Sequence, residues 1–370
     1  MLDGRIFRDR MERIQDFLLD RDADFALLTP SPNFLYLTGI HYEMRERLIG
    51  LLVTPDEGPK IVAPSFEVST LRTQTWITDF LPWAEDENPY KRIAEVVSPS
   101  TDGHIAFFDD SMPLGVYWAV QLEFQKMREC ASLSPLLNKM RLRKSEQEVD
   151  LMMRAGHVID IAVSNAIAKA RLGMTELQVR QIIENEIVDR EGTPTFATVQ
   201  FGENSAHPHN DSGLRQLSVG DVVLLDCGCS IAGYNTDMTR VAVVGYATDE
   251  QKAVYSVVLK AEEAALARLS KGLACGTADG IARKVIEEAG YGAAFTHRLG
   301  HGIGLEVHEP PYLVHGNPAE LEPGMTHSVE PGIYLEGKFG IRIEDLVCIC
   351  EDGCQVITYS PKDLRVIDTQ

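Results

Sequence analysis

Two aspartates set into apolar stretches constrain this chain more than any other feature of its sequence. The stretch DVVLLDCGCSIAGYNTDMTRVAVVG (221–245) has two apolar segments around a turn rich in glycine and asparagine, which is typical of a β-hairpin. Asp226 is expected to end the first strand and Asp237 to begin the second. One such aspartate would be typical of a turn, but a carboxylate beside an apolar strand is unfavourable unless it is paired or metal-bound. Two facing carboxylates repel each other and favour a cation between them.

Two glutamates occupy comparable positions further along the chain. Glu330 follows an apolar run in SVEPGIY and precedes a Pro-Gly pair. In IRIEDLV (341–347), strand periodicity places Arg342 and Glu344 on one face, and an Arg–Glu ladder on an exposed edge strand is the alternative interpretation. If all four acids share one site, they and an imidazole would suit two divalent cations, whose charge of about +4 balances the carboxylates. Carboxylate-rich sites favour hard cations such as Mn²⁺.

The chain of 370 residues is long enough for two domains. Helix and strand patterns alternate over residues 1–137, which predicts a smaller α/β domain. From 138 to 370, long helices and antiparallel hairpins interleave, which predicts an α+β domain. Its first two helices are predicted to begin after Ser145 and Thr175, each of which has the Glu or Gln of a capping box three residues on.

Local patterns also predict individual elements. Residues 326–334 and 340–351 are each predicted to form a strand, as are residues 76–80. The apolar segment 116–124 fits either a helix or a strand.

Charge and cysteine usage restrict the class of protein. The formal net charge is -20, which disfavours nucleic acid and anionic membranes as partners because both require a basic surface. The chain lacks an apolar run long enough for a membrane span, and its first residues do not resemble a signal peptide. The cysteines are scattered without a CxxC pair, and two pairs at i, i+2 spacing suit buried strand positions better than zinc ligands. These features predict a reduced, cytoplasmic protein.

Four motifs together resemble those of one enzyme family. They are DCGCSIAGYNTDMTR, HRLGHGIGLEVHEPPY, HSVEPGIY and GIRIED. The chain resembles the pita-bread (M24-type) metallopeptidases over its whole length, and among them it is most similar to the Xaa-Pro dipeptidases (prolidases) and aminopeptidases P. The resemblance implies an α+β pita-bread catalytic domain, residues 138–370, preceded by a smaller α/β creatinase-type N-terminal domain, residues 1–137.

The resemblance assigns roles to individual residues. It implies two divalent metal ions, Mn²⁺ in the first place with Co²⁺ or Zn²⁺ as alternatives, and the ligands Asp226, Asp237, His301, Glu330 and Glu344.

The same resemblance implies residues that act on the substrate. Glu330 would also receive a proton and pass it to the leaving nitrogen, and His308 would hydrogen-bond the scissile carbonyl. His209 would position the substrate, and Arg342 would orient Glu344 or an aspartate. His297 lies outside the ligand set, either beside the site or as a packed or surface histidine.

Position 312 departs from some prolidases. They place an arginine there that could bind the substrate's C-terminal carboxylate, whereas this chain has Tyr312. The cation would then come from elsewhere, with Arg45 or Arg47 of a neighbouring subunit in a homodimer as candidates.

The function implied is hydrolysis of Xaa-Pro bonds in dipeptides, with short proline-containing peptides as partners. The alternatives are an aminopeptidase P that acts on longer peptides and, from another class, an inactive peptide-binding protein of the same fold. Missing ligands would mark the inactive protein or a metal-free creatinase, and the ligand set is complete here. Methionine aminopeptidases share the fold but lack this first domain.

Overall fold

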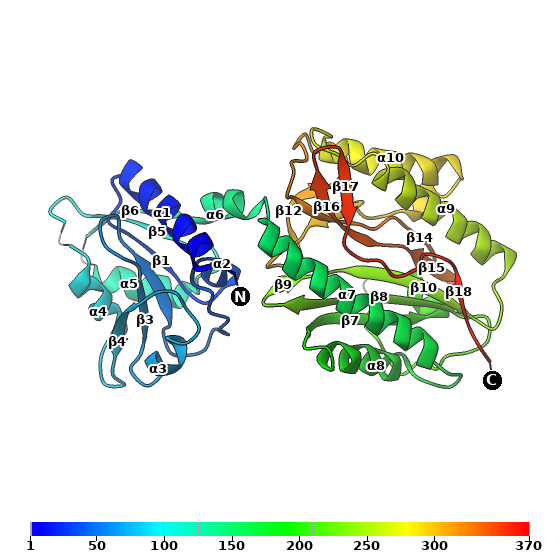
Figure 1. Ribbon diagram of the computed structural model, residues 1–370, viewed down its shortest axis with the longest axis horizontal. Helices are drawn as coiled ribbons and strands as arrows, with labels where there is room; N and C mark the ends of the chain where they lie inside the picture. Colours follow the sequence, from blue (N-terminus) through cyan, green and yellow to red (C-terminus); the bar gives the residue numbers. More distant parts are fainter. Residues whose placement is uncertain (1, 99, 125, 209, 370) are drawn as a thin grey trace. The chain divides into compact units, whose positions relative to one another are not determined.

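The computed structural model describes residues 2–98, 100–124, 126–208 and 210–369. The chain divides into two compact units, Met1–Arg141 and Leu142–Gln370, which we call the N-terminal and catalytic units (Figure 1).

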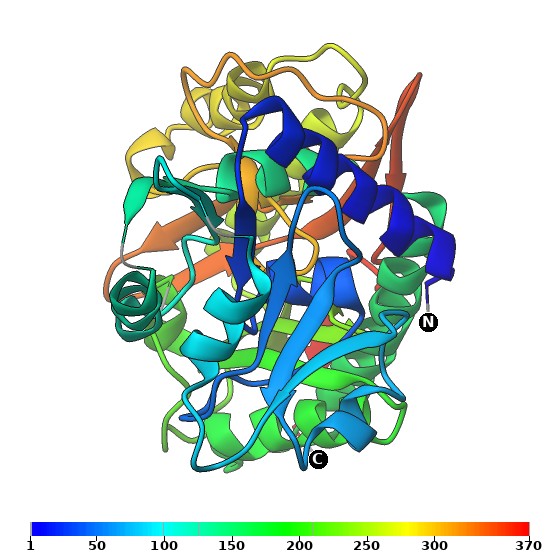
Figure 2. The same ribbon diagram turned by 90° about the vertical axis from the view of Figure 1, so that its left-hand side faces the viewer.

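The N-terminal unit is an α/β domain built on a mixed sheet, which Figure 2 brings to the front. Among the described residues the strands follow the order β4-β3-β2-β1-β5-β6, with parallel pairs β3–β4, β1–β5 and β5–β6. The strands are β1 (Phe25–Leu28), β2 (Gly50–Val53), β3 (Lys60–Pro64), β4 (Asp79–Trp83), β5 (His104–Phe108) and β6 (Met127–Ser132). The helices are α1 (Gly4–Asp20), α2 (Pro32–Thr38), α3 (Val68–Leu71), α4 (Pro89–Val96), α5 (Leu114–Glu123) and α6 (Ser134–Arg141).

The structure corrects the expected position of one strand of this unit and decides the secondary structure of one ambiguous segment. The strand expected at 76–80 lies at Asp79–Trp83, because β4 is an edge strand and therefore tolerates Pro82. The ambiguous segment 116–124 is mostly helical, as α5, and Val116 and Val120 lie one helical turn apart in the buried core.

The catalytic unit is an α+β domain whose helices pack on its sheets (Figure 1). Its helices are α7 (Glu146–Lys169), α8 (Glu176–Val188), α9 (Asp249–Leu266) and α10 (Cys275–Glu288), with 3₁₀ turns η1 (Gly202–Ala206) and η2 (Gly292–Ala294). Its strands are β7 (Thr193–Phe201), β8 (Val222–Ile231), β9 (Tyr234–Asn235), β10 (Met238–Val244), β11 (Gly300–Gly302), β12 (Glu309–Leu313), β13 (Thr326–Val329), β14 (Gly332–Leu335), β15 (Phe339–Arg342), β16 (Asp345–Cys350), β17 (Gly353–Val356) and β18 (Arg365–Ile367). The described strands form a sheet β18-β10-β8-β7 with β9 beside β8, a sheet β12-β11-β13-β16-β17, and a hairpin β14–β15.

The predicted capping boxes are confirmed. In both α7 and α8 the side chain of the N-cap residue, Ser145 or Thr175, accepts a hydrogen bond from the third helical residue. The side chain of that residue returns the bond to the cap backbone.

Three strand expectations are wrong in a way that matters for the site. Asp226 does not end its strand, because β8 continues to Ile231. The strand expected over 326–334 breaks between β13 and β14, where Pro331 has no N–H to donate to a ladder. The strand expected over 340–351 breaks between β15 and β16, because β15 pairs with β14 whereas β16 pairs with β13. The chain therefore changes sheet at both interruptions.

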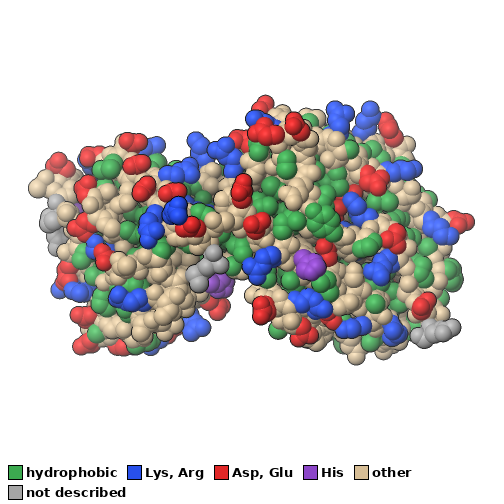
Figure 3. Space-filling model, in the orientation of Figure 1, with side chains coloured by type: hydrophobic (Ala, Val, Ile, Leu, Met, Phe, Trp, Pro, Cys, Tyr) green, Lys and Arg blue, Asp and Glu red, His purple; other side chains and the backbone are tan. Residues whose placement is uncertain are grey.

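The structure shows where the charged side chains and the cysteines lie. Acidic and basic side chains are interspersed on the face shown in Figure 3. Cys227, Cys229 and Cys348 are buried as expected, whereas Cys350 at the end of β16 is exposed. In the part of the chain that the structure describes, every helix is too short or too polar to cross a membrane.

We predict that Gly156→Ala destabilises the catalytic unit although alanine favours helices. A Cβ at Gly156 in α7 would lie 2.4 Å from the carbonyl oxygen of Ile357, so the helix must move away from the C-terminal segment. The expected loss is about 1–3 kcal/mol in the free energy of unfolding, measured in urea. Gly280→Ala in α10 is the matched control: nothing lies within 4 Å of its Cβ, so it should be neutral or stabilising by up to about 1 kcal/mol. Equal effects of the two substitutions would contradict the prediction.

Candidate metal centre

A cavity of about 550 Å³ in the catalytic unit collects most of the residues predicted from sequence. It is lined by Phe196, Thr198, Pro208, Asp226, Asp237, His297, Arg298, His301, Val307, His308, Glu330, Arg342 and Glu344. Tyr312 is not among the residues that line it. His209 lies outside the described residues, and its neighbour Pro208 belongs to the cavity wall.

The acidic side chains reach the cavity from the β8–β10 hairpin and from the two strand interruptions. Asp226 lies within β8 opposite Thr239, and Asp237 immediately precedes β10. Alternation along the paired strands places both aspartates on one face of the hairpin. Glu330 lies between β13 and β14, and Glu344 between β15 and β16. The backbone at these interruptions is freed from the regular ladder and can direct each glutamate into the cavity.

His301 is held by close backbone packing on both sides. It is the central residue of β11, and glycines flank it. A Cβ at Gly300 would lie 2.0 Å from the carbonyl oxygen of Ser328, and one at Gly302 would lie 2.6 Å from that of Glu309. Only glycine permits these approaches, which explains the GHG sequence around the imidazole.

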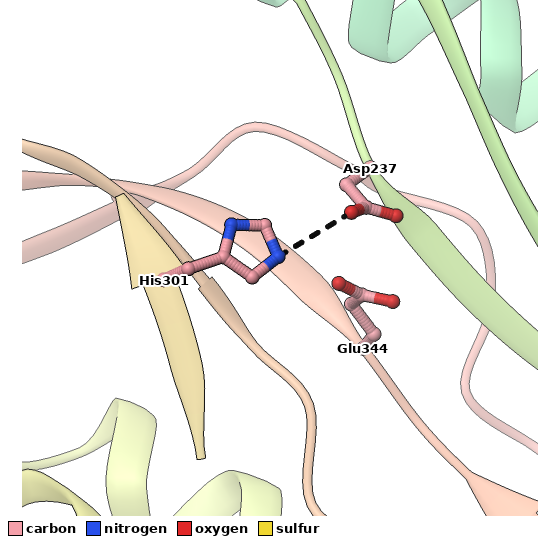
Figure 4. Close-up of side chains that lie close together, drawn as sticks. All are labelled: Asp237, His301 and Glu344. Atoms are coloured by element: carbon pink, nitrogen blue, oxygen red, sulfur yellow. Dashed lines mark ion pairs between the residues drawn. The ribbon is translucent and has the colours of Figure 1, made fainter. Parts of the chain in front are cut away.

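Asp237, His301 and Glu344 form a compact buried cluster, and their ligand atoms lie within 4.8 Å of one another (Figure 4). His301 Nε2 lies 3.6 Å from Asp237 Oδ2 and 3.4 Å from Glu330 Oε1. Asp237 Oδ1 and Glu344 Oε1 are buried and have no hydrogen-bond partner among the described residues. Buried carboxylate oxygens without partners are strongly unfavourable, and a divalent cation would satisfy them. The donor set therefore fits a metal ion.

The pKa values reflect the concentration of negative charge. Burial raises the pKa of Asp237 well above its usual value, and the carboxylates of Asp226 and Glu330 raise it further. Burial likewise raises the pKa of Glu344, and it raises that of Glu330 to about 7. Burial lowers the pKa of His301 to about 3, so its imidazole is neutral at pH 7, the form that ligates metals.

Arg342 supplies the positive charge beside this cluster. Its guanidinium forms an ion pair with Asp226, and its Nε donates to Thr239 Oγ1 at 2.9 Å. Thr239 Oγ1 in turn donates to Glu344 Oε2 at 2.6 Å. Arg342 thus contacts an aspartate directly and reaches Glu344 through a threonine that sequence reasoning missed. Because Arg342 is 4% exposed and Glu344 1% exposed, the alternative of a ladder on an exposed edge is wrong.

His297 is linked to the same arginine. Its Nε2 lies 2.9 Å from Tyr334 Oη, which accepts a hydrogen bond from Arg342 at 2.8 Å. The half-buried His297 is therefore part of the cavity wall rather than a surface histidine. Sequence analysis did not identify Tyr334. Its position next to Ile333 in the strand after Glu330 would place its side chain on the opposite face from that apolar residue, which is a weak indication of a role in the site.

Sequence analysis also missed Arg298, although it lies within the motif HRLGHGIGLEVHEPPY (297–312), which we call the histidine-rich motif. It lines the cavity, and its guanidinium lies 4.2 Å from the ring centroid of Tyr312, a cation–π contact. Tyr312 thereby supports a cavity residue without lining the cavity itself.

Arg47, one of the two arginines considered for binding the substrate carboxylate, lies in the N-terminal unit. There it forms ion pairs with Glu85 at 2.7 Å and with Glu46.

A buried network fixes the backbone of Glu344. Arg240 donates to the carbonyl oxygens of Glu344 at 2.6 Å and Thr239 at 3.0 Å, and it pairs with Asp345 at 2.6 Å. The C-terminal segment completes this network. The Ser360 carbonyl accepts from Arg240, and Lys362 pairs with Asp345 at 2.7 Å. Such outer contacts orient the ligands of metal sites.

Comparison with known proteins agrees with this geometry. Residues 150–351 match the family described as metallopeptidase family M24, and residues 10–143 match the creatinase/prolidase N-terminal domain. The chain is 33% identical to an Xaa-Pro dipeptidase of Lactobacillus helveticus over 96% of this chain and 98% of that protein. A prolidase structure from Thermococcus sibiricus matches with a TM-score of 0.91 at 32% identity, covering 99% of this chain and all of that one. The X-Pro aminopeptidase structure of Thermotoga maritima matches with a TM-score of 0.86 at 28% identity, covering 96% and 99%.

We predict that metal loading releases protons near neutral pH. Carboxylates must be ionised to bind metal, and burial holds the pKa of Glu330 at about 7 and those of Asp237 and Glu344 above their usual range. Release should fall as the pH rises above 7, because Glu330 is then ionised before metal is added. Titration calorimetry with Mn²⁺, repeated in buffers of different ionisation enthalpy, measures the number of protons released. The Glu330→Gln variant should release fewer protons at pH 7, and a release that does not vary with pH would contradict the prediction.

Proposed function

Because the chain belongs to metallopeptidase family M24, we propose that it hydrolyses Xaa-Pro dipeptides with two bound divalent metal ions. The proposed ligands are Asp226, Asp237, His301, Glu330 and Glu344. The observation that carries the proposal is the convergence of these five side chains in one cavity. Two of their buried carboxylate oxygens have no hydrogen-bond partner among the described residues. Oxygen-rich ligands support Mn²⁺ as the metal, with Co²⁺ or Zn²⁺ as alternatives.

When bound, the metal ions supply Lewis-acid chemistry, which activates water and polarises the scissile carbonyl. Glu330, whose Oε1 accepts a hydrogen bond from Ser328 at 3.2 Å, would take the proton of the attacking water and deliver it to the proline nitrogen. His308 would donate a hydrogen bond to the carbonyl oxygen as negative charge develops there. Its ring packs against that of His301 with centroids 4.3 Å apart, which keeps it beside the ligands. His209 would position the substrate from the loop that contains Pro208.

The cavity wall supports a preference for proline and for a free carboxylate. Phe196, Pro208 and Val307 provide apolar surface for a proline ring, whose nitrogen has no N–H to satisfy. Arg298 provides the cation that Tyr312 does not, and its stacking on the Tyr312 ring holds the guanidinium in place. We therefore propose that Arg298, and not Arg45 or Arg47, binds the C-terminal carboxylate of the substrate.

The proposal extends to assembly and location. The family resemblance of the sequence motifs implies a homodimer, and we include it in the proposal. The seven cysteines are all free, which suits the reducing cytoplasm. An aminopeptidase acting on longer Xaa-Pro peptides is the second candidate, supported by the Thermotoga maritima relative, whose identity to this chain is lower than that of the dipeptidase and the prolidase.

The function is tested with a peptide panel on protein stripped of metal and then loaded with Mn²⁺. We expect cleavage of Ala-Pro but not of Ala-Pro-Ala or Met-Ala-Ala, and no cleavage before metal is added. Preferred cleavage of Ala-Pro-Ala would replace the dipeptidase by the aminopeptidase. Metal binding without cleavage of any peptide would favour the inactive peptide-binding protein, and activity of metal-free protein would overturn the metal mechanism.

Arg298→Met is predicted to lower kcat/KM for Ala-Pro by about 10- to 100-fold, because a hydrogen bond to a charged group contributes about 1.5–3 kcal/mol. Steady-state kinetics on Ala-prolinamide, which has no carboxylate, provide the control: here the variant and the wild type should differ little. If the variant loses the same factor on both substrates, Arg298 does not read the carboxylate.

A further inference from the structure

Two acidic residues of the histidine-rich motif, Glu306 and Glu309, have no role in the proposed reaction, and neither does Lys144 ahead of α7. We propose that Lys144 is a positioning residue, which fixes the loop that carries His308 through a buried ion pair with Glu309. The loop comprises residues 303–308, between β11 and β12. The inference rests on the proposed function only for the role of His308.

The ion pair is enclosed by protein. Lys144 Nζ lies 3.1 Å from Glu309 Oε2, and each side chain is 4% exposed. The other carboxylate oxygen of Glu309 accepts a hydrogen bond from the backbone N–H of Glu306 at 3.0 Å. Glu309 directly follows His308. One of its carboxylate oxygens therefore holds the backbone of Glu306 within the loop, and the other pairs with Lys144.

Lys144 is itself anchored to the body of the catalytic unit. Its backbone N–H donates to the carbonyl oxygen of Gly324 at 2.7 Å, and the N–H of Gly324 donates to Ile349 in β16 at 2.9 Å. The ammonium group thus projects from a fixed backbone position, and the ion pair connects the loop to the sheet that also carries His301.

The loop packs closely over the ion pair. A Cβ at Gly304 would lie 2.8 Å from Lys144 Cε and 2.9 Å from Glu309 Oε1. On its other side, the Gly304 carbonyl accepts hydrogen bonds from the backbone and side chain of Asn235 at 2.8 and 3.0 Å. With the loop held between Lys144 and Asn235, the His308 ring stays against His301.

Stability alone gives little reason to bury this pair. The desolvation of two charges offsets most of their attraction, and apolar residues of similar volume stabilise a core as well or better. A buried pair does, however, specify one relative position of the two segments, because any displacement of one segment separates the two charges. This requirement ties the position of His308 to Lys144, a residue 165 positions away from Glu309 in the sequence.

The experiment compares Lys144→Met, Lys144→Arg and the double variant Lys144→Met with Glu309→Gln in the full-length, metal-loaded protein. The double variant removes both buried charges yet leaves glutamine to accept from Glu306, so it keeps the test informative if the single variant folds poorly. The matched control is Arg143→Met, because the adjacent Arg143 forms an exposed ion pair with Glu322 at 3.0 Å.

For Ala-Pro we expect kcat to fall about 10- to 100-fold in Lys144→Met and in the double variant, with KM and bound metal little changed. Lys144→Arg should recover most of the activity, and Arg143→Met should match the wild type. Amide hydrogen exchange over residues 302–309 should be faster in the double variant and unchanged in Arg143→Met.

A double variant with wild-type kcat and wild-type exchange would overturn the proposal, as would a loss of kcat that follows a loss of metal. Failure of the proposed function is distinguishable, because a wild type that cleaves no dipeptide would remove the role of His308. The exchange measurement would still report whether the ion pair holds the loop.

Discussion

The mutual repulsion of four carboxylates inside one domain is the constraint on which the catalytic unit depends. Asp226, Asp237, Glu330 and Glu344 line one cavity, and burial raises the pKa of the last three. The ion pair of Arg342 with Asp226 offsets part of this charge. Asp237 Oδ1 and Glu344 Oε1 remain buried without hydrogen-bond partners among the described residues. The unit is therefore most stable when cations or protons bind to these carboxylates.

The fold meets this constraint by leaving its ladders irregular where the acids emerge. β13 and β16 pair in one sheet and β14 and β15 in another, so the chain leaves one sheet and enters the other at Glu330 and again at Glu344. The β8–β10 hairpin remains regular at Asp226, which lies opposite Thr239. A continuous hairpin and two segments that pass between sheets thus meet at one centre, and the backbone contacts of Arg240 hold the segment at Glu344 in place.

Sequence patterns predicted the acids better than the geometry around them. A carboxylate within an apolar run is conspicuous, so all four acids and the capped helices could be identified locally. The strand interruptions could not, because the apolar pattern continues through them and the change of sheet is decided by pairing partners elsewhere. Tyr334, Arg298 and Lys144 were missed for a related reason. Arg298 contacts Tyr312, Tyr334 contacts Arg342 on the paired strand, and Lys144 contacts Glu309 far away in the sequence. A solvent-exposed residue of the same type would give the same local pattern.

The network beneath Glu344 has a consequence for how the protein is made. The acidic hairpin is synthesised first, Arg342 more than a hundred residues later, and the Ser360 and Lys362 contacts to Arg240 and Asp345 later still. During translation from the N-terminus, the hairpin therefore emerges from the ribosome before Arg342, whose guanidinium pairs with Asp226. The contacts of Ser360 and Lys362 can form only after residues 360–362 have been synthesised, so the complete network around the centre cannot assemble before then.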